Sequence, residues 1–408
     1  MEKGNKTIVG ALVFVLLAAL PACSPGALVA PGLDLAERAV MERPSFTDDD
    51  EARMAQENAR NFEAENAMWD DPLLEAYLTD MLQRLVAVAE PKPFAYRVRV
   101  VGDSDVNAFT WGGGLIYVHA GLIARMENEA QLASVMAHEL AHVTHRHVPK
   151  GIEQAYTTSL LGDVAMVGVG AAGADSGALG AALDKTYEYT MNAAINGHGR
   201  GREAEADEVG MALMVDAGYD PREAAGAFEQ LLKEFGDQAP VVNFFYGSHP
   251  TLVGRIERSR ELVATRYADR LTSERLGVNT EEFKRRTREL VVLVGVLDYE
   301  AKRFKTATAM FEKAAAVWDG DPVPPYYLGL IAMETGGPAE VTAAISHFNT
   351  AIAADAEYAP AYRELGTAHY RDGDSQTAVL AYERYLELAP RAEDADRIAA
   401  TIAELERY

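Results

Sequence analysis

The sequence has 408 residues, with 38 Lys and Arg against 62 Asp and Glu, one cysteine and 49% hydrophobic residues. This composition is typical of a globular protein and excludes a disordered chain, and the length suffices for two or three domains. The formal charge of −24 argues against a nucleic-acid partner, because binding to a phosphate backbone needs a basic surface. A single cysteine cannot form an internal disulfide, so cysteine content identifies neither an oxidising compartment nor a thiolate metal site.

The amino terminus has the features of an export signal. Lys3 and Lys6 precede an uncharged apolar run over residues 8–20, which is too short for a transmembrane helix of ~20 residues. A basic start, a short apolar segment and small residues at its end are typical of a cleavable signal peptide. We therefore predict a signal peptide over residues 1–22 and an exported protein.

The end of this segment, Leu20-Pro21-Ala22-Cys23, resembles the lipobox of bacterial lipoproteins, in which a leucine stands three positions before the lipidated cysteine. The resemblance implies that Cys23 is lipidated and anchors the chain to a membrane. Ser24 follows the cysteine, which resembles the sorting pattern for the outer membrane of a Gram-negative cell and implies a periplasmic location. Because lipoboxes usually carry Ala or Ser where Pro21 stands, cleavage by ordinary signal peptidase is the alternative.

Three regions follow the signal. Residues 23–48 contain three prolines and several small residues, which predicts a tether. In residues 49–271 apolar side chains recur at helical spacing, so we expect helices to dominate this domain. Within it, the alternation over residues 94–101 and the apolar residues 115–118 after a triple glycine predict a small sheet. A repeat domain is predicted over residues 275–408.

One predicted helix, residues 127–147, contains His138-Glu139-Leu140-Ala141-His142, an H-E-x-x-H zinc motif. Four residues advance a helix by slightly more than one turn, so the two imidazoles point the same way and can share one Zn²⁺. Glu139 stands beside them, where its carboxylate can take a proton from water that attacks a peptide carbonyl. The pattern therefore predicts a metallopeptidase site on this helix.

A catalytic zinc needs three protein ligands and one open position. The metzincin pattern is excluded, because its glycine and third histidine are absent after the motif. A second helix supplies carboxylates instead: Glu203 and Asp207 are four residues apart and share a face, whereas Glu205 points elsewhere. Glu203 can ligate the metal while Asp207 accepts the outer N–H of His138. Taken alone this segment favours a solvated acidic helix face, and the upstream motif favours the catalytic interpretation.

The motifs together resemble those of a known peptidase group. The H-E-x-x-H motif is followed by Glu-x-Glu-Ala-Asp, then Ala-Gly-Tyr-Asp-Pro, then Ser-His-Pro with Arg255. This order, over about residues 50–265, is similar to the gluzincin peptidases of the HtpX and CAAX-prenyl protease type, and among them to the BepA-like proteins, which carry tetratricopeptide repeats. The resemblance implies one zinc ion per chain, with Glu139 as the catalytic base and three ligands: His138, His142 and Glu203.

In BepA-like proteins the histidine of the His-Pro motif lies near the zinc and can occupy its open position in a latent state. Carried onto His249, the resemblance implies that this residue either caps the zinc until substrate arrives or stabilises the oxyanion during catalysis. The alternative is a histidine at a helix start, with Pro250 in the first turn. Arg255 is a further candidate for the same pocket.

Several other features carry alternatives. His145 and His147 could bind a second metal, but a solvated basic helix end that complements the helix dipole is favoured. The glycines at 112–114 lack the lysine of a phosphate loop and predict a turn into a strand. The family resemblance implies that residues 115–118 form the edge to which an extended substrate adds as a strand. Residues 160–183, rich in Ala and Gly, predict a helical hairpin or lid over the active site.

The carboxyl-terminal third repeats with the tetratricopeptide period of ~34 residues. Phe311, Phe348 and Tyr382 align at intervals of 37 and 34 residues, and a glycine-containing helix precedes each. Residues 395–408 predict a capping helix. Paired helices of this kind leave a concave surface that usually binds a protein segment, and a structural buttress for the peptidase is the alternative.

The predicted fold is mainly α (α+β): a zincin-type helical peptidase domain with a small β-sheet, followed by an α-solenoid of tetratricopeptide repeats. We expect a zinc metalloendopeptidase of the cell envelope that acts on unfolded or misassembled envelope proteins in quality control. The resemblance to BepA-like proteins implies outer-membrane protein assembly as the setting, with the repeats contacting the assembly machinery. The alternative is a periplasmic chaperone or assembly adaptor that acts through its repeats and has a latent zinc site.

Overall fold

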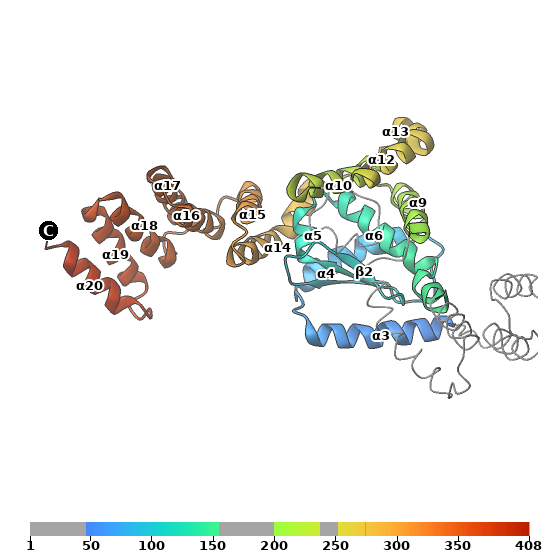
Figure 1. Ribbon diagram of the computed structural model, residues 1–408, viewed down its shortest axis with the longest axis horizontal. Coiled ribbons are helices and arrows are strands. Elements are labelled where there is room, and N and C mark those ends of the chain that lie inside the picture. Colours follow the sequence, from blue (N-terminus) through green and yellow to red (C-terminus); the bar gives the residue numbers. More distant parts are fainter. Residues whose placement is uncertain (1–45, 155–199, 237–251, 274, 408) are drawn as a thin grey trace, which may run out of the picture.

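The computed structural model describes residues 46–154, 200–236, 252–273 and 275–407 (Figure 1). The predicted signal peptide, Cys23, most of the tether, the hairpin of residues 160–183 and His249 lie outside the described residues. Within the described ranges, we find no helix that is both long and apolar enough to span a bilayer. Helices around a small sheet are followed by a row of helix pairs, so the predicted fold class is confirmed.

The sheet has three strands, β1 (Arg97–Val101), β2 (Ala108–Thr110) and β3 (Leu115–His119), in the order β1-β3-β2. β1 runs parallel to β3, and β2 runs antiparallel to it. The expectation that residues 115–118 form an edge is therefore wrong, because β1 and β2 pair with both sides of β3. Met68 forms a bridge with Val101 of β1, so among the described strands β2 has the uncovered outer edge.

A glycine turn joins β2 to β3. Gly112, Gly113 and Gly114 have positive φ angles of 88°, 62° and 82°, a conformation that residues with a Cβ rarely adopt. The Thr110 hydroxyl donates to the Leu115 carbonyl at 2.8 Å and accepts the Gly112 N–H at 3.0 Å. The predicted turn into a strand is confirmed.

Helices cover both faces of the sheet (Figure 1). On one face lies α3 (Asp48–Glu65), whose Phe62 packs edge-on against Trp111 and Tyr117 with ring centroids 5.3 and 5.2 Å apart. On the other face lie α4 (Pro72–Val86) and α6 (Glu129–Thr144). Because side chains alternate along a strand, every second strand residue belongs to the core with α4 and α6: Val98, Val100, Ile116 and Val118.

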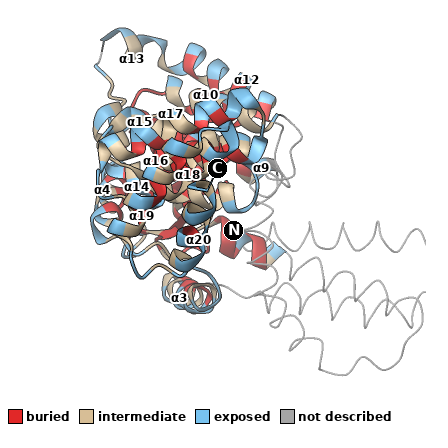
Figure 2. Cartoon of the chain, turned by 90° about the vertical axis from the view of Figure 1, so that its left-hand side faces the viewer, coloured by how far each residue is buried: buried red, intermediate tan, exposed pale blue. Residues whose placement is uncertain are grey.

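The described helices of this amino-terminal part also include α5 (Ala120–Arg125), α9 (Arg200–Asp216), α10 (Arg222–Phe235) and α12 (Leu252–Leu262). Helix α12 continues through a π-helical turn (Val263–Tyr267) into α13 (Ala268–Ser273). α9 packs closely along α6. Gly210 permits this, because a Cβ there would lie 2.9 Å from the backbone nitrogen of His138. Figure 2 shows that buried residues lie between the helices, whereas the outer sides of α3 and α13 are exposed.

The carboxyl-terminal part is a row of helix pairs that extends away from the sheet (Figure 1). The pairs are α14 (Thr280–Glu300) with α15 (Phe304–Val317), α16 (Val323–Thr335) with α17 (Pro338–Ala354), and α18 (Ala359–Asp372) with α19 (Ser375–Leu388), followed by α20 (Ala395–Leu405). In each pair a glycine of the first helix faces a ring of the second, and a Cβ would come within 3.0 Å of that ring: Gly295 and Phe311, Gly329 and Phe348, Gly366 and Tyr382. The repeated sequence positions thus mark one close helix contact per pair.

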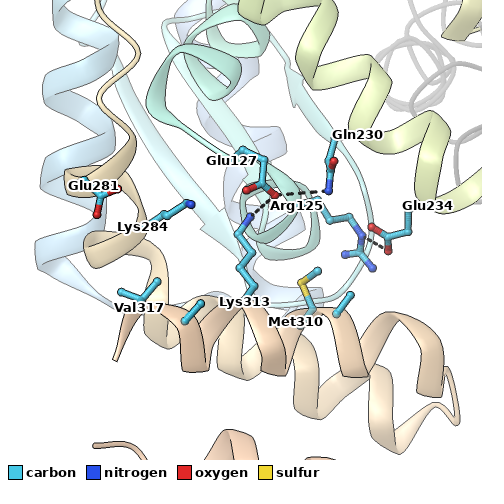
Figure 3. Close-up of a pocket in the computed structure, with 11 residues that line it drawn as sticks. Arg125, Glu127, Gln230, Glu234, Glu281, Lys284, Met310, Lys313 and Val317 are labelled. Atoms are coloured by element: carbon cyan, nitrogen blue, oxygen red, sulfur yellow. Dashed lines mark hydrogen bonds and ion pairs between the residues drawn. The ribbon is translucent and has the colours of Figure 1, made fainter. Parts of the chain in front are cut away.

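The first helix pair shares the core of the amino-terminal part. Apolar side chains of α14 and α15 lie in the same hydrophobic cluster as α4, α5, α6 and α10: Phe283, Leu290, Val291, Val294, Met310 and Ala314. A pocket of about 410 Å³ remains between α10, α14 and α15, and Figure 3 shows Lys313 pointing across it toward Glu127. The two parts are therefore packed together rather than joined by a linker alone.

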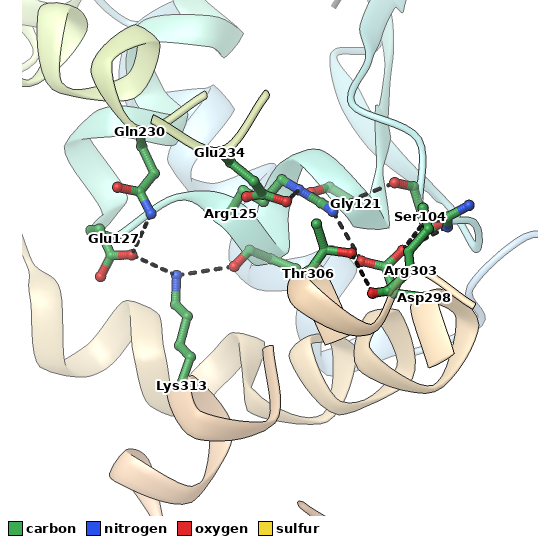
Figure 4. A network of polar contacts seen from close by, with 11 residues as sticks. Ser104, Gly121, Arg125, Glu127, Gln230, Glu234, Asp298, Arg303, Thr306 and Lys313 are labelled. Atoms are coloured by element: carbon green, nitrogen blue, oxygen red, sulfur yellow. Dashed lines mark hydrogen bonds and ion pairs between the residues drawn. The ribbon is translucent and has the colours of Figure 1, made fainter. Parts of the chain in front are cut away.

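Polar contacts accompany this packing (Figure 4). Arg125 of α5 donates to Asp298 of α14 at 3.1 Å and to Glu234 of α10 at 2.8 Å. Lys313 of α15 donates to the carbonyls of Ala124 and Met126 at the end of α5, at 3.0 and 2.6 Å. Because carbonyls at a helix end lack partners within the helix, a cation is favourable there. The end of α5 is thus fixed to the first helix pair.

Candidate metal centre

Helix α6 positions three of the predicted site residues. It begins after Asn128, whose side chain accepts the Gln131 N–H at 3.0 Å and so stabilises the helix start. Because α9 packs on one side of the helix and the sheet on another, His138, Glu139 and His142 are only 6%, 5% and 2% exposed. Buried polar groups need partners, and α9 supplies two of them, Glu203 and Asp207.

Three ligand atoms meet between α6 and α9. The Nε2 atoms of His138 and His142 are 3.0 Å apart, and Glu203 Oε2 lies 3.2 Å from the first and 3.7 Å from the second. One ligand atom from each residue lies within 4.8 Å of the others. Two imidazole nitrogens and one carboxylate oxygen at this spacing could hold a divalent metal ion. The structure thus brings the three residues predicted as ligands to one point.

Glu139, the predicted base, lies next to this centre. Burial raises the pKa of its carboxyl to about 8; the charge of His138 opposes the rise, and the nearby Glu203 adds to it. A carboxyl group with a pKa near neutrality can both accept and return a proton. A cation held by the three ligands would lower this pKa and favour the carboxylate form. The arrangement therefore places a proton acceptor beside a candidate metal centre.

The outer nitrogen of His138 faces a carboxylate of α9. Its Nδ1 lies 3.0 Å from Asp207 Oδ1, so Nδ1–H can donate to Asp207 while Nε2 keeps its lone pair for a metal. Arg255 of α12 also pairs with Asp207, and its guanidinium lies 4.3 Å from the centre of the Phe228 ring. Burial favours the neutral form of Asp207, but Arg255 and His138 hold the pKa of this carboxyl well below its usual range. Asp207 and Arg255 are therefore both part of the centre.

The outer nitrogen of His142 faces another histidine. His147 Nδ1 lies 2.7 Å from His142 Nδ1, and His147 Nε2 lies 3.3 Å from Glu205 Oε2 of α9. The favoured interpretation of His147 as part of a solvated helix end is wrong, because its side chain is fully buried. The cause is a backbone turn: α6 ends at Thr144, and Arg146 has a positive φ of 56°.

The sequence pattern did not predict a role for His147 or Glu205 at this site. Helix spacing sends Glu205 to a different face from Glu203, as predicted, and that face meets His147. Burial, together with the charges of His142 and His145, lowers the pKa of His147 to about 3, so its ring is neutral near pH 7. The available signal was a histidine five residues after His142, but only the backbone turn before it shows where its ring lies.

A second group of possible ligands lies at the carboxyl end of β3. Ligand atoms of Asp103, Asp105 and His119 also lie within 4.8 Å of one another. His119 Nδ1 is 2.8 Å from Asp103 Oδ1, and the same oxygen accepts the Asp105 N–H at 3.0 Å. Because this carboxylate already contacts the His119 ring and accepts a hydrogen bond within a turn, we assign no metal to the group.

Similarity to two solved TPR structures is weak. The first TPR of Spaghetti (RPAP3) bound to an HSP90 peptide is 21% identical and covers 30% of this chain and 96% of that chain, with a TM-score of 0.28. YrrB, a TPR protein, is 11% identical and covers 49% of this chain and 89% of its own, with a TM-score of 0.25. The repeat architecture rests on the helix pairs and their glycine and aromatic contacts.

Curated relatives are more informative. The beta-barrel assembly-enhancing protease of Escherichia coli (strain K12) is 30% identical over 213 residues, which are 52% of this chain and 43% of the relative. That of Yersinia pestis is 31% identical over 205 residues, 48% of this chain and 39% of the relative. The mitochondrial metalloendopeptidase OMA1 of Schizosaccharomyces pombe is 29% identical over 246 residues, 58% of this chain and 68% of the relative.

The chain thus spans about two fifths of the length of these bacterial relatives. Residues 72–263 match peptidase family M48. That range contains α6, α9 and the whole ligand cluster. Residues 72–263 are therefore a metallopeptidase domain of peptidase family M48.

Proposed function

We propose that this chain is a zinc-dependent endopeptidase of the bacterial cell envelope, which cleaves unfolded or misassembled proteins, outer-membrane proteins above all. The observation that carries the proposal is the convergence of His138, His142 and Glu203 beside the buried carboxylate of Glu139. The family M48 match and relatives named for β-barrel assembly support it.

The ligand cluster fits zinc. Catalytic zinc sites combine imidazole nitrogen and carboxylate oxygen from three residues and leave one position open. His138 and His142 both present Nε2 to the centre, and their Nδ1 atoms face Asp207 and His147, as expected when the outer nitrogen of a ligand is fixed by a hydrogen bond. Zinc, when bound, acts as a Lewis acid: it polarises a peptide carbonyl and lowers the pKa of water, so that water gives up a proton more readily as it attacks the carbonyl.

The protein's own groups perform the proton transfers and the positioning. Glu139 accepts the proton that the attacking water gives up and passes it to the leaving amine. Asp207, held by Arg255, keeps the ring of His138 oriented and its Nδ1 protonated. Because the centre is buried between two helices, these groups stay in place without reorganisation by bulk water.

His249 belongs to the same proposal, on the strength of the Ser-His-Pro motif. It either caps the open zinc position at rest or stabilises the oxyanion during catalysis. A His249→Ala variant separates these roles: a capping histidine, when removed, raises activity, whereas an oxyanion donor, when removed, lowers it. Unchanged zinc affinity together with unchanged cleavage would exclude both.

The substrate binds along β2 in this proposal. β2 packs against α6, and only one of its edges is paired among the described strands. An extended peptide can add to such an edge through main-chain hydrogen bonds, which need no particular side chains. Unfolded proteins expose extended main chain, so this mode of binding suits an enzyme of protein quality control.

The setting is also proposed. The signal peptide and Cys23 support export and a lipid anchor in the outer membrane, and the helix pairs α14 to α20 would bind substrate or the assembly machinery. A chaperone or adaptor that acts through these repeats is the competing function. The general base beside three convergent ligands favours the peptidase, because a scaffold does not need one.

Zinc content and cleavage of casein test the proposal, with the chain from Ser24 onward compared with its Glu139→Gln variant. We expect one zinc per chain in both proteins and cleavage only in the unmodified chain. Zinc in both proteins without cleavage in either would support the chaperone function instead. Absence of zinc from the unmodified chain would refute the metallopeptidase.

A further inference from the structure

Two consecutive hydrogen bonds, the first to His147 and the second from His147 to Glu205, connect His142 to α9. His142 Nδ1 faces His147 Nδ1 at 2.7 Å, and His147 Nε2 faces Glu205 Oε2 at 3.3 Å. The His147 side chain is fully buried, whereas that of Glu205 is 50% exposed. The connection therefore runs from the interior of the centre to the surface of α9.

A metal on His142 Nε2 would fix the direction of both hydrogen bonds. A histidine that ligates a metal through Nε2 carries its proton on Nδ1, so His142 donates. His147 Nδ1 must then accept, which in a neutral ring leaves the proton on Nε2. That nitrogen donates to Glu205, because an ionised carboxylate has no proton to donate and can only accept. Each group thus has the partner that its protonation state requires.

We propose that His147 and Glu205 are positioning residues for the metal ligand His142, equivalent in role to Asp207 for His138. This inference rests on the proposed function, since it assigns His142 Nε2 to zinc. Asp207 contacts its histidine directly at 3.0 Å, whereas Glu205 acts through His147. The second ligand histidine is therefore oriented by an imidazole, and that imidazole by a carboxylate.

The size of the effect follows from other metal sites. Removal of a hydrogen-bond partner from a ligand histidine typically weakens metal binding by about 10–100-fold. We expect this range for His147, because it is buried and contacts the ligand directly. We expect less than about tenfold for Glu205, because interactions of half-exposed charges are weakened by solvent.

A pair of variants of matched shape separates hydrogen bonding from packing. Leu and Asn have the same number of side-chain heavy atoms and the same branching at Cγ, but only Asn has an acceptor near the position of the His147 Nδ1. In the full chain from Ser24, loaded with zinc, competition with a chelator should show zinc affinity lowered 10–100-fold in His147→Leu and less than about fivefold in His147→Asn. Equal losses in the two variants, or no loss in His147→Leu, would overturn the proposal.

Glu205→Ala tests the outer end of the connection, with Glu208→Ala as its control. Glu208 lies on the same helix and pairs with Arg266 at the surface, away from the ligand histidines. We expect a loss of zinc affinity of a few-fold for Glu205→Ala and none for Glu208→Ala. Equal affinities of the two variants would remove Glu205 from the proposal.

A measurement on the unmodified chain avoids any folding defect of the variants. With ¹⁵N-labelled histidine, NMR of the zinc-loaded protein should show His142 protonated on Nδ1 and His147 protonated on Nε2 alone. His147 protonated on Nδ1 would overturn the assignment. If the unmodified chain binds no zinc, the proposed function fails; if it binds zinc and cleaves casein while His147→Leu keeps full affinity, only this inference fails.

Discussion

The buried contact between α5 and α14 offers a quantitative test of how the two parts of the chain are joined. Asp298 is 0% exposed and the Arg125 side chain 2% exposed. Asp298 accepts hydrogen bonds from Arg125 at 3.1 Å and from Arg303 at 3.0 and 2.6 Å (Figure 4). An Asp298→Ala substitution removes this carboxylate and leaves Arg125 buried, with Glu234 as its remaining carboxylate partner.

The expected cost follows from desolvation. Removing one partner of a buried ion pair costs about 3–5 kcal/mol, because the remaining charge stays out of water. Since Glu234 still contacts Arg125 at 2.8 Å, we expect the low end of this range, about 3 kcal/mol in the free energy of unfolding. That is roughly a hundredfold change in the ratio of folded to unfolded protein. Asp298→Asn keeps the shape and one acceptor and should cost less.

Urea unfolding of the full chain from Ser24, followed by tryptophan fluorescence, to which the buried Trp111 contributes, measures this loss. The matched control is Glu229→Ala, which breaks a surface pair with Arg260 whose side chains are 45% and 65% exposed and should cost less than about 1 kcal/mol. A loss in Asp298→Ala no larger than in this control would refute the reasoning. So would separate unfolding of α14 and the sheet, because they share one hydrophobic cluster.

Three further predictions concern packing and charge. Gly210→Ala should push α9 away from α6, because the new methyl group would lie 2.9 Å from backbone; we expect a loss of about 1–3 kcal/mol in urea unfolding and weaker zinc binding in chelator competition. A chain ending at Ser273 should be insoluble, whereas one ending at Trp318 keeps α14 and α15 and should be soluble and bind zinc. Burial alone would raise the pKa of Glu129, but hydrogen bonds from Tyr77 and other donors hold this pKa below its usual value of 4.5. These hydrogen bonds therefore stabilise the folded protein above pH 4.5, and this stabilisation is lost as the pH falls through the lowered pKa. Tyr77→Phe should therefore cost about 1.5–3 kcal/mol near neutral pH and less in acid, and an equal loss at both pH values in urea unfolding would contradict this.

The ligand cluster could be predicted because its information is local. The spacing of His138 and His142 fixes their common face on any helix, and Glu203 is a ligand type on a second helix. The repeats could be predicted for a similar reason, since Gly329 and Phe348 recur with their counterparts at the period of the helix pairs. Helix spacing and residue type together determine such features before the chain is folded.

Other features depend on contacts between distant segments. The sequence around β3 is typical of a strand, but only the pairing with β1 and β2 shows that this strand is central. The alternation of apolar and polar residues along a strand does not determine the order of strands in the sheet. The role of His147 depends on the positive φ of Arg146, a conformation that is uncommon in residues other than glycine. Without this turn, the most reasonable expectation for a histidine at a helix end is exposure to solvent.

Helix α9 supplies three of the carboxylates around the candidate metal centre. Glu203 offers an oxygen to the ligand cluster, Asp207 contacts the outer nitrogen of His138, and Glu205 reaches His147 beside His142. All three carboxylates thus come from one and a half turns of the same helix, so a small shift of α9 along α6 would alter every one of these contacts together. Gly210 sets that separation, because its missing Cβ lets α9 lie directly against the α6 backbone. A substitution at this glycine, which contacts no metal itself, should therefore change zinc affinity more than the loss of Glu205, the outermost of the three carboxylates.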